Sequence, residues 1–125
     1  MARKLRNVSL YINDILDSIR KIETYTGEKD FNQFRTDSLT VDAVIRNFEI
    51  IGEAANQIPK SFKDSYKEVE WKYLIDFRNV IIHEYFGINY EIIWDIIQNE
   101  LQPLKCKISE LQNKLNNTQI PLEWE

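Results

Sequence analysis

WKYLIDFRNVIIHEYFG, residues 71–87, contains the only histidine of the chain, His83, and ends in a glycine. Its apolar residues recur every three or four positions, a spacing that places side chains on one face of an α-helix. One such face consists of Leu74, Phe77, Ile81 and Tyr85. The pattern predicts a long helix over residues 71–87 that packs this face into the core and stops at Gly87.

A second apolar face lies on another side of the same predicted helix. It consists of Ile75, Ile82 and Phe86, with the polar residues Arg78, Asn79 and His83 beside it. A monomer would leave these large apolar side chains in water together with a cation, an amide and an imidazole. The pattern therefore predicts a surface through which two copies of the chain associate around a polar site.

Helical spacing also dominates the sequence on both sides of this stretch. Three further long helices are predicted over residues 8–25, from the capping residues at 37–40 to Pro59, and from Asn89 to Leu115. Pro103 predicts a kink or break near Leu101 in the last of them. Two short segments are expected to be connectors, residues 29–34 with at most a helical turn or two and residues 59–69 with one helical turn. These elements predict an all-α fold, an antiparallel four-helix bundle with short accessory helical turns and no β-strand.

Length and composition fit one soluble helical domain. The 125 residues include 43% hydrophobic and 29% charged residues but only three Gly and three Pro, which excludes a disordered tail and a loop-rich β domain. We expect a single domain over residues 1–115 and a tail over 116–125, where periodicity is weak and Trp124 either docks or is free.

Cysteine content and charge indicate in which cellular compartment the protein lies and what it can bind. The single cysteine, Cys106, has no partner for an internal disulfide and no metal-site pattern around it, which favours a reducing compartment and predicts a cytoplasmic protein. No apolar run reaches the roughly 18 residues that span a bilayer, so we expect no membrane association. A net charge of −4 argues against a broad electrostatic grip on nucleic acid. Any contact with RNA must therefore be local.

Residues 78–85, RNVIIHEY, resemble the signature of HepT-like toxins, a branch of the HEPN superfamily of helical ribonucleases. That signature is an arginine, a four-residue spacer, a histidine, one further residue and a tyrosine. Three other segments resemble the same family: LYINDIL at 10–16, DAVIRNFEIIGEAA at 42–55, and YFG at 85–87 followed by Trp94. Arginine and histidine at this spacing also occur by chance, but the added asparagine, tyrosine and upstream IGEA make the pattern specific. The resemblance covers nearly the whole chain and implies a HEPN-like bundle.

The second predicted long helix contains two features of interest. Gly52, Ala54 and Ala55 lack bulk and would let another helix approach closely, even though glycine costs about 1 kcal/mol inside a helix. Arg46, Glu49 and Glu53 have helical spacing on the same segment. They form either a solvated face with internal ion pairs or a wall of the functional site, and helical spacing does not decide between the two.

The residues of the signature suit metal-independent cleavage of RNA. Such cleavage needs a base for the 2′-hydroxyl, an acid for the leaving 5′-oxygen and positive charge at the phosphorus. His83 has a free pKa of about 6.5, so both of its protonation states exist near neutral pH, and Arg78 can donate two hydrogen bonds to a phosphate. Asn79 lies one helical turn before His83 and could orient the imidazole or bind a phosphate oxygen. A lone histidine near a helix end is more often structural, and a lone arginine is more often a surface ion pair. The resemblance favours catalytic roles for both.

The resemblance implies a specific biological role. A two-fold dimer would bring two copies of His83 and Arg78 to one RNA substrate in a composite site at the dimer interface. Tyr85 would be the residue to which a partner nucleotidyltransferase antitoxin of the MntA type attaches AMP, which silences the toxin. ATP and Mg²⁺ would bind to that partner, and no cofactor or metal is expected on this chain. Spacing alone places Tyr85 in the core or at an interface.

Two alternatives to an endoribonuclease toxin stay open at this point. The chain could be an inactive HEPN helical adaptor that only binds a nucleotidyltransferase partner. It could also be a dimerisation bundle without a substrate. The complete set of Arg78, Asn79, His83 and Tyr85 favours the ribonuclease, while the acidic net charge favours the adaptor.

Overall fold

Helix α1, Ala2–Thr26, forms the first long segment of the bundle. The computed structural model describes residues 2–83 and 87–117, and the side chains of residues 7–82 and 87–117. One apolar face of α1 is at most 2% exposed and consists of Val8, Ile12, Ile15, Leu16, Ile19 and Ile22. The helix predicted over residues 8–25 is confirmed, and its observed start lies earlier in the chain.

Aspartates begin the next two helices. Asp30 starts α2, Phe31–Thr36, with a capping box in which Asp30 and Gln33 satisfy each other's backbone N–H groups. Asp37 starts α3, Ser38–Gln57, by accepting hydrogen bonds from the backbone N–H of Thr40 at 3.2 Å and from its hydroxyl at 2.7 Å. Helix α4, Lys60–Ser65, follows as a short turn. The expected capping residues and accessory turns are therefore confirmed.

The predicted long helix over residues 71–87 is wrong as one continuous element. The structure has two short helices, α5, Trp71–Ile75, and α6, Phe77–Ile81, separated at Asp76, where φ is −87° and ψ is 2°. The chain then becomes extended at Ile82, the last of three consecutive β-branched residues, whose side chains disfavour helix. The Asn89 N–H donates to the Ile81 carbonyl at 2.9 Å and occupies an acceptor at the end of α6.

A small β-hairpin replaces the end of the predicted helix. Strands β1, Ile82–His83, and β2, Gly87–Ile88, pair antiparallel, with Ile82 opposite Ile88 and His83 opposite Gly87. Gly87 has a φ of +75°, a conformation that glycine adopts without strain. The expectation of no β-strand is therefore corrected by these two short strands, and Gly87 serves the hairpin instead of stopping a helix.

The last long segment is divided as predicted. Asn89 caps α7, Tyr90–Asn99, and Glu100 separates it from α8, Leu101–Asn117. Pro103 lies in the first turn of α8, where its missing N–H interrupts no internal helical hydrogen bond. The predicted break near Leu101 is thus confirmed.

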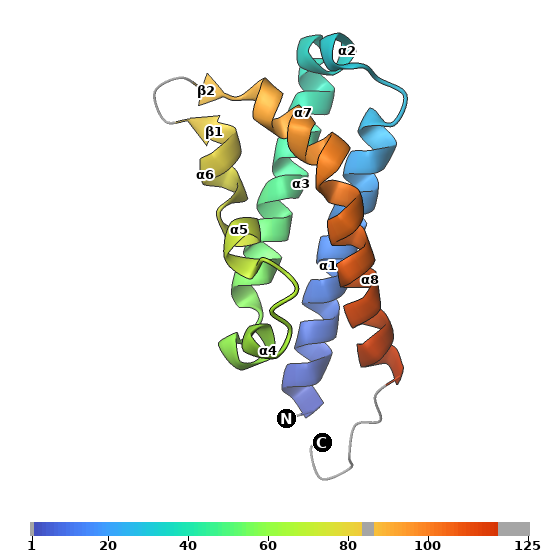
Figure 1. The fold of residues 1–125 in the computed structure, drawn as a ribbon, viewed down its shortest axis with the longest axis vertical. Helices are drawn as coiled ribbons and strands as arrows, with labels where there is room; N and C mark the ends of the chain where they lie inside the picture. Colours follow the sequence, from blue (N-terminus) through green and yellow to red (C-terminus); the bar gives the residue numbers. More distant parts are fainter. Residues whose placement is uncertain (1, 84–86, 118–125) are drawn as a thin grey trace.

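The bundle has four segments, which are α1, α3, α5 with α6, and α7 with α8. They run alternately up and down the molecule, as Figure 1 shows. Helices α1 and α3 lie side by side, α8 packs on α1, and α5 and α6 pack on α3. The rings of Phe48 in α3 and Phe77 in α6 meet edge to face with centroids 5.0 Å apart inside the core. The all-α bundle is confirmed. The tail that contains Trp124 lies outside the described residues from 118 onward, so the domain boundary stays a prediction.

None of the helices in the described part of the chain combines the length and the apolar character that crossing a bilayer would require.

Candidate active site

Helix α6 has one buried face and one exposed polar face. Phe77 and Ile81 are at most 2% exposed, and Leu74 in α5 continues the same buried face, as the apolar spacing predicted. Arg78 and Asn79 lie on the exposed part of α6. The predicted division of this segment into a core face and an outer polar face is therefore confirmed for these residues.

The remaining residues of the signature follow α6 directly. His83 lies in β1, two residues after the end of α6, and its backbone pairs with Gly87. Its side chain is outside the described part of the chain, and so are Tyr85 and Phe86. The structure thus brings Arg78 and Asn79 to one surface at the base of the hairpin that contains His83.

A groove lies beside Arg78, between α3 and the α5–α6 segment. We call it the Arg78 groove, and its lining residues are Phe48, Glu49, Gly52, Glu53, Asn56, Ile75 and Arg78. Gly52 makes the close approach of the two segments possible, because a Cβ at this position would lie 3.0 Å from the Leu74 carbonyl oxygen and 3.3 Å from that of Ile75. The expected close packing at Gly52 is confirmed.

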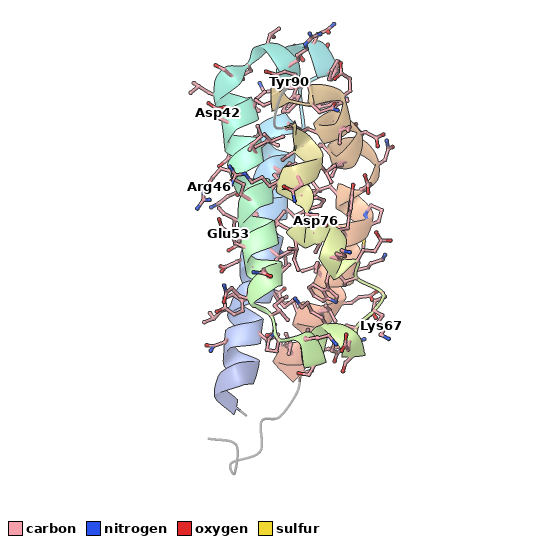
Figure 2. The ribbon with its side chains drawn as sticks, turned by 90° about the vertical axis from the view of Figure 1, so that its left-hand side faces the viewer. Asp42, Arg46, Glu53, Lys67, Asp76 and Tyr90 are labelled. Carbon is pink, nitrogen blue, oxygen red and sulfur yellow. The ribbon has the colours of Figure 1, made fainter. Side chains whose placement is uncertain are left out.

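Two glutamates of α3 line this groove, and both pair with Arg46 of the same helix. Arg46 lies 3.4 Å from a carboxylate oxygen of Glu53 and 4.0 Å from one of Glu49, and Figure 2 shows Arg46 and Glu53 along α3 next to Asp76. Because the Arg46 side chain is 59% exposed, these ion pairs contribute little to stability. The interpretation as a face with internal ion pairs is therefore confirmed. Glu49 and Glu53, without Arg46, line the groove, and their role as a wall of the functional site stays a prediction.

The charges of the groove limit what it can bind. Arg78 supplies a guanidinium on the outer surface, where its planar fork can donate to two oxygens of one phosphate. Glu49 and Glu53 face the same groove, and Arg46 offsets part of their negative charge. This balance favours a local contact with one phosphate over a broad grip on a nucleic acid. Among the described side chains of residues 7–82 and 87–117, no three of His, Cys, Asp or Glu are grouped to hold a metal ion.

Asn56 is a groove residue that the sequence analysis missed. It lies on α3 three residues after Glu53 and seven after Glu49, and all three line the Arg78 groove. The helical spacing that grouped Glu49 with Glu53 extends to Asn56 and would have identified it.

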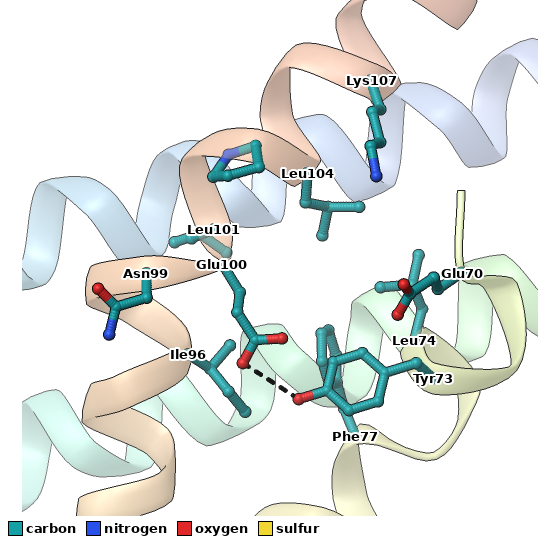
Figure 3. Close-up of a pocket in the computed structure, with 11 residues that line it drawn as sticks. Glu70, Tyr73, Leu74, Phe77, Ile96, Asn99, Glu100, Leu101, Leu104 and Lys107 are labelled. Atoms are coloured by element: carbon teal, nitrogen blue, oxygen red, sulfur yellow. Dashed lines mark hydrogen bonds between the residues drawn. The ribbon is translucent and has the colours of Figure 1, made fainter. Parts of the chain in front are cut away.

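A second cavity on the other side of α5 was also missed. Figure 3 shows Tyr73 and Glu100 meeting there, and the Tyr73 hydroxyl donates to a Glu100 carboxylate oxygen at 3.3 Å in a cavity that Leu74, Phe77 and Ile96 also line. Burial of the phenol, followed by the negative charge of Glu100, raises the pKa of Tyr73 to about 12. No local sequence signal links these two residues, because 27 positions separate them.

Known proteins resemble this chain over most of its length. A family model described as Ribonuclease HepT-like matches residues 15–111. A protein of Methanocaldococcus jannaschii that is named as a candidate RNase is 43% identical over 96 residues, which cover 77% of this chain and 79% of that protein. A protein of Thermococcus cleftensis named Probable ribonuclease HepT is 38% identical over 102 residues, which cover 82% of this chain and 93% of that protein.

A longer relative shows that the same unit also occurs within a larger protein. A Methanocaldococcus jannaschii protein named as a gamma-glutamylcyclotransferase and candidate RNase is 36% identical over 89% of this chain, which spans 50% of the length of that protein. No solved structure shows a significant match. Because the family model covers residues 15–111 and several relatives match most of the sequence, the chain belongs to the HepT-like ribonuclease family.

Proposed function

We propose that this protein is the toxin component of a toxin–antitoxin pair and acts as a metal-independent endoribonuclease. The observation that carries the proposal is the exposed Arg78, which lines a groove between α3 and α6 at the base of the hairpin that contains His83. Membership of the HepT-like ribonuclease family supports RNA as the substrate.

The proposed reaction uses two copies of one histidine. Neutral His83 takes the proton of the RNA 2′-hydroxyl, the 2′-oxygen attacks phosphorus, and the bond from phosphorus to the 5′-oxygen breaks. His83 of the partner subunit, in its protonated form, gives a proton to that leaving oxygen. Arg78 donates hydrogen bonds to the nonbridging oxygens as negative charge accumulates on them. The products are a 2′,3′-cyclic phosphate and a free 5′-hydroxyl, and Asn79 orients the imidazole or binds a phosphate oxygen.

The proposed reaction uses a homodimer, because each chain supplies one histidine. The outer apolar residue Ile82 is only half-buried within one subunit, which leaves surface for a second copy to cover. Light scattering on the purified protein should therefore give a mass of two subunits of 15.0 kDa at assay concentrations. A single-subunit mass under conditions where RNA is cut would contradict the composite site.

Cleavage of RNA by purified variants tests the catalytic assignments. We expect His83→Ala and Arg78→Ala each to lower the rate by a factor on the order of 10² to 10⁴, because each loses a group that acts in the transition state. Arg20→Ala is the matched control, since Arg20 is an exposed arginine on α1. A chelator should leave wild-type cleavage intact. Cleavage at the wild-type rate in both site variants would remove the proposed roles.

We also propose that a nucleotidyltransferase antitoxin of the MntA type silences the toxin through Tyr85. The Tyr85 hydroxyl oxygen would attack the α-phosphorus of ATP on the partner, and pyrophosphate would leave. The attached AMP would add negative charge and bulk near Arg78 and block RNA. Incubation with the partner, ATP and Mg²⁺ should raise the protein mass by one or more AMP groups, and Tyr85→Phe should prevent this. Tyr25→Phe is the control, because Tyr25 is 39% exposed.

An inactive adaptor is the second candidate, and the acidic lining of the Arg78 groove favours it. Glu49 and Glu53 would repel phosphate there, and the whole chain has a net charge of −4. An adaptor would bind the nucleotidyltransferase but leave RNA intact at every protein concentration. RNA cleavage that is lost in His83→Ala excludes the adaptor.

A further inference from the structure

We propose that a second groove, next to the Arg78 groove, binds the phosphate backbone of the RNA strand on one side of the cleavage point. This lysine groove lies between α4 and α5, and its lysines are Lys60, Lys63, Lys67 and Lys72. The inference rests on the proposed function, because it extends the binding site for the same RNA.

The two grooves meet at one residue. Ile75, the last residue of α5, lines both the lysine groove and the Arg78 groove. In the view of Figure 2, Lys67 lies toward the lower end of the molecule and Asp76 nearer the middle, beside the α3 residues Arg46 and Glu53. A strand that places its scissile phosphate at Arg78 can therefore continue past Ile75 into the lysine groove.

The charge of the lysine groove differs in sign from that of the chain. Its described lining has four lysines against three carboxylates, those of Asp64, Glu70 and Asp76, whereas the whole protein has a net charge of −4. In an acidic protein, phosphate contacts are confined to such local surpluses of positive charge.

Two of the four lysines are already engaged within the protein. The Lys60 ammonium lies 3.3 Å from an Asp64 carboxylate oxygen, and the Lys63 ammonium donates to the Ala55 carbonyl at 3.1 Å near the end of α3. Lys67 and Lys72 are exposed, and neither side chain has a hydrogen bond or an ion pair with any residue in the described part of the chain. These two ammonium groups are therefore the ones available for phosphates.

The groove would bind RNA without regard to base sequence. Ammonium groups on flexible stems contact phosphates as point charges and carry no base information. Each phosphate contact on a single strand adds about 0.7 to the slope of log affinity against log salt concentration. Removal of Lys67 and Lys72 together should lower that slope by about 1.4, which at about 0.1 M salt corresponds to a roughly 25-fold loss of affinity.

The experiment measures binding of a nuclease-inert probe at several salt concentrations. The probe is a 2′-O-methyl oligouridine of about ten nucleotides, a length within the range of single-strand sites. We expect the double variant Lys67→Gln, Lys72→Gln to show the reduced slope and affinity. The matched control is Arg20→Gln, Lys21→Gln, which removes two exposed cations from α1, a helix that lines neither groove. Thermal melting checks that both variants are folded.

A minimal substrate separates this inference from the proposed ribonuclease. A dinucleotide reaches only the catalytic groups, so its cleavage rate should be equal in the wild type and in the Lys67→Gln, Lys72→Gln variant. If the wild type cuts neither short nor long RNA, the proposed function fails whatever the binding data show. If cleavage occurs but the salt slope is unchanged, or falls equally in the α1 control, the lysine groove is not an RNA site. An unchanged slope with weakened binding to a partner protein would also overturn the inference, in favour of a protein-docking groove.

Discussion

Helix α1 and residues 71–88 have the same apolar spacing but different backbones. Helix α1 continues through 25 residues, while the later segment forms two helices of five residues each and then a hairpin. Helix α1 packs against both α3 and α8, whereas α5 and α6 pack mainly on α3. The comparison teaches that apolar spacing decides which side chains are buried, while neighbouring elements and local residues decide how far a helix continues.

The interrupted segment is also the one that contains the signature residues. Its inner side chains, Leu74, Phe77 and Ile81, are as buried as those of α1. Its outer residues Arg78 and Asn79 are exposed next to the hairpin. The segment therefore has a buried inner face and an exposed outer face. Variants of the inner face should lower stability, whereas variants of the outer face should lower activity and leave stability almost unchanged.

The largest expected loss of stability comes from Phe77→Ala. Phe77 is 2% exposed, and its ring contacts those of Phe48 and Tyr73, so its removal leaves a cavity at the junction of α3, α5 and α6. We expect the free energy of unfolding in urea to fall by about 3–5 kcal/mol, whereas exposed Arg78→Ala should change it by less than about 0.5 kcal/mol.

Ile15→Ala provides the corresponding change in α1. Ile15 is fully buried, and we expect a loss of about 2–5 kcal/mol. If Phe77→Ala costs less than about 1 kcal/mol while Ile15→Ala costs the expected amount, the inner face of α6 is not part of the cooperative core.

Gly52→Val should cause the next largest loss of stability, because the valine side chain would push α3 away from α5. A Cβ at this position already lies 3.0 Å from the Leu74 carbonyl oxygen, and valine adds two methyl groups. We expect a loss of about 1–3 kcal/mol in urea unfolding, typical of overpacking. Gly52→Ala should cost less, because the gain in helix propensity of about 1 kcal/mol offsets the crowding.

Glu53→Ala, at the exposed neighbouring position, is the control for Gly52. Its side chain is 64% exposed, so only a weak ion pair with Arg46 is lost. If Gly52→Val and Glu53→Ala have equal effects, the contact between α3 and α5 is not tightly packed.

The sequence predicted the long helices and the buried face of residues 71–81, because regular spacing and capping residues such as Asp37 are local signals. It failed at Asp76 and at Ile82, where the same apolar spacing continues but the backbone changes. Three β-branched residues, Val80 to Ile82, were a usable signal for the end of α6. The Arg78 groove was predicted only in part, because its other side comes from α3, and contacts between distant segments leave no trace in local spacing.

A smaller effect on stability is expected at the starts of α3 and α6, each of which follows an aspartate. Asp37 accepts hydrogen bonds from Thr40 that lower the pKa of its carboxyl, while the Asp76 side chain makes no capping hydrogen bond. We expect Asp37→Ala to lower the melting temperature and Asp76→Ala to leave it almost unchanged.

Acid should reveal the same difference between the two aspartates. Because the folded pKa of Asp37 is depressed, its contribution is present above the unfolded pKa of about 3.9 and is lost as pH falls through the folded pKa. Asp37→Ala should therefore show a smaller loss of melting temperature on acidification than the wild type. Equal acid sensitivity in the two proteins would mean that the Asp37 cap contributes nothing to stability.

The smallest expected effect concerns the contact that joins α5 to the break between α7 and α8. Burial and the Glu100 charge raise the pKa of Tyr73 to about 12 from an ordinary value of 10.0. A raised folded pKa means that the contribution of Tyr73 is complete below about pH 10 and is lost as pH rises from there through about 12. Tyr73→Phe keeps the edge-to-face packing on Phe77 but removes the titrating hydroxyl. We therefore expect its urea midpoint to fall less steeply than that of the wild type above pH 10, and identical slopes would show that the hydroxyl of Tyr73 does not couple α5 to Glu100.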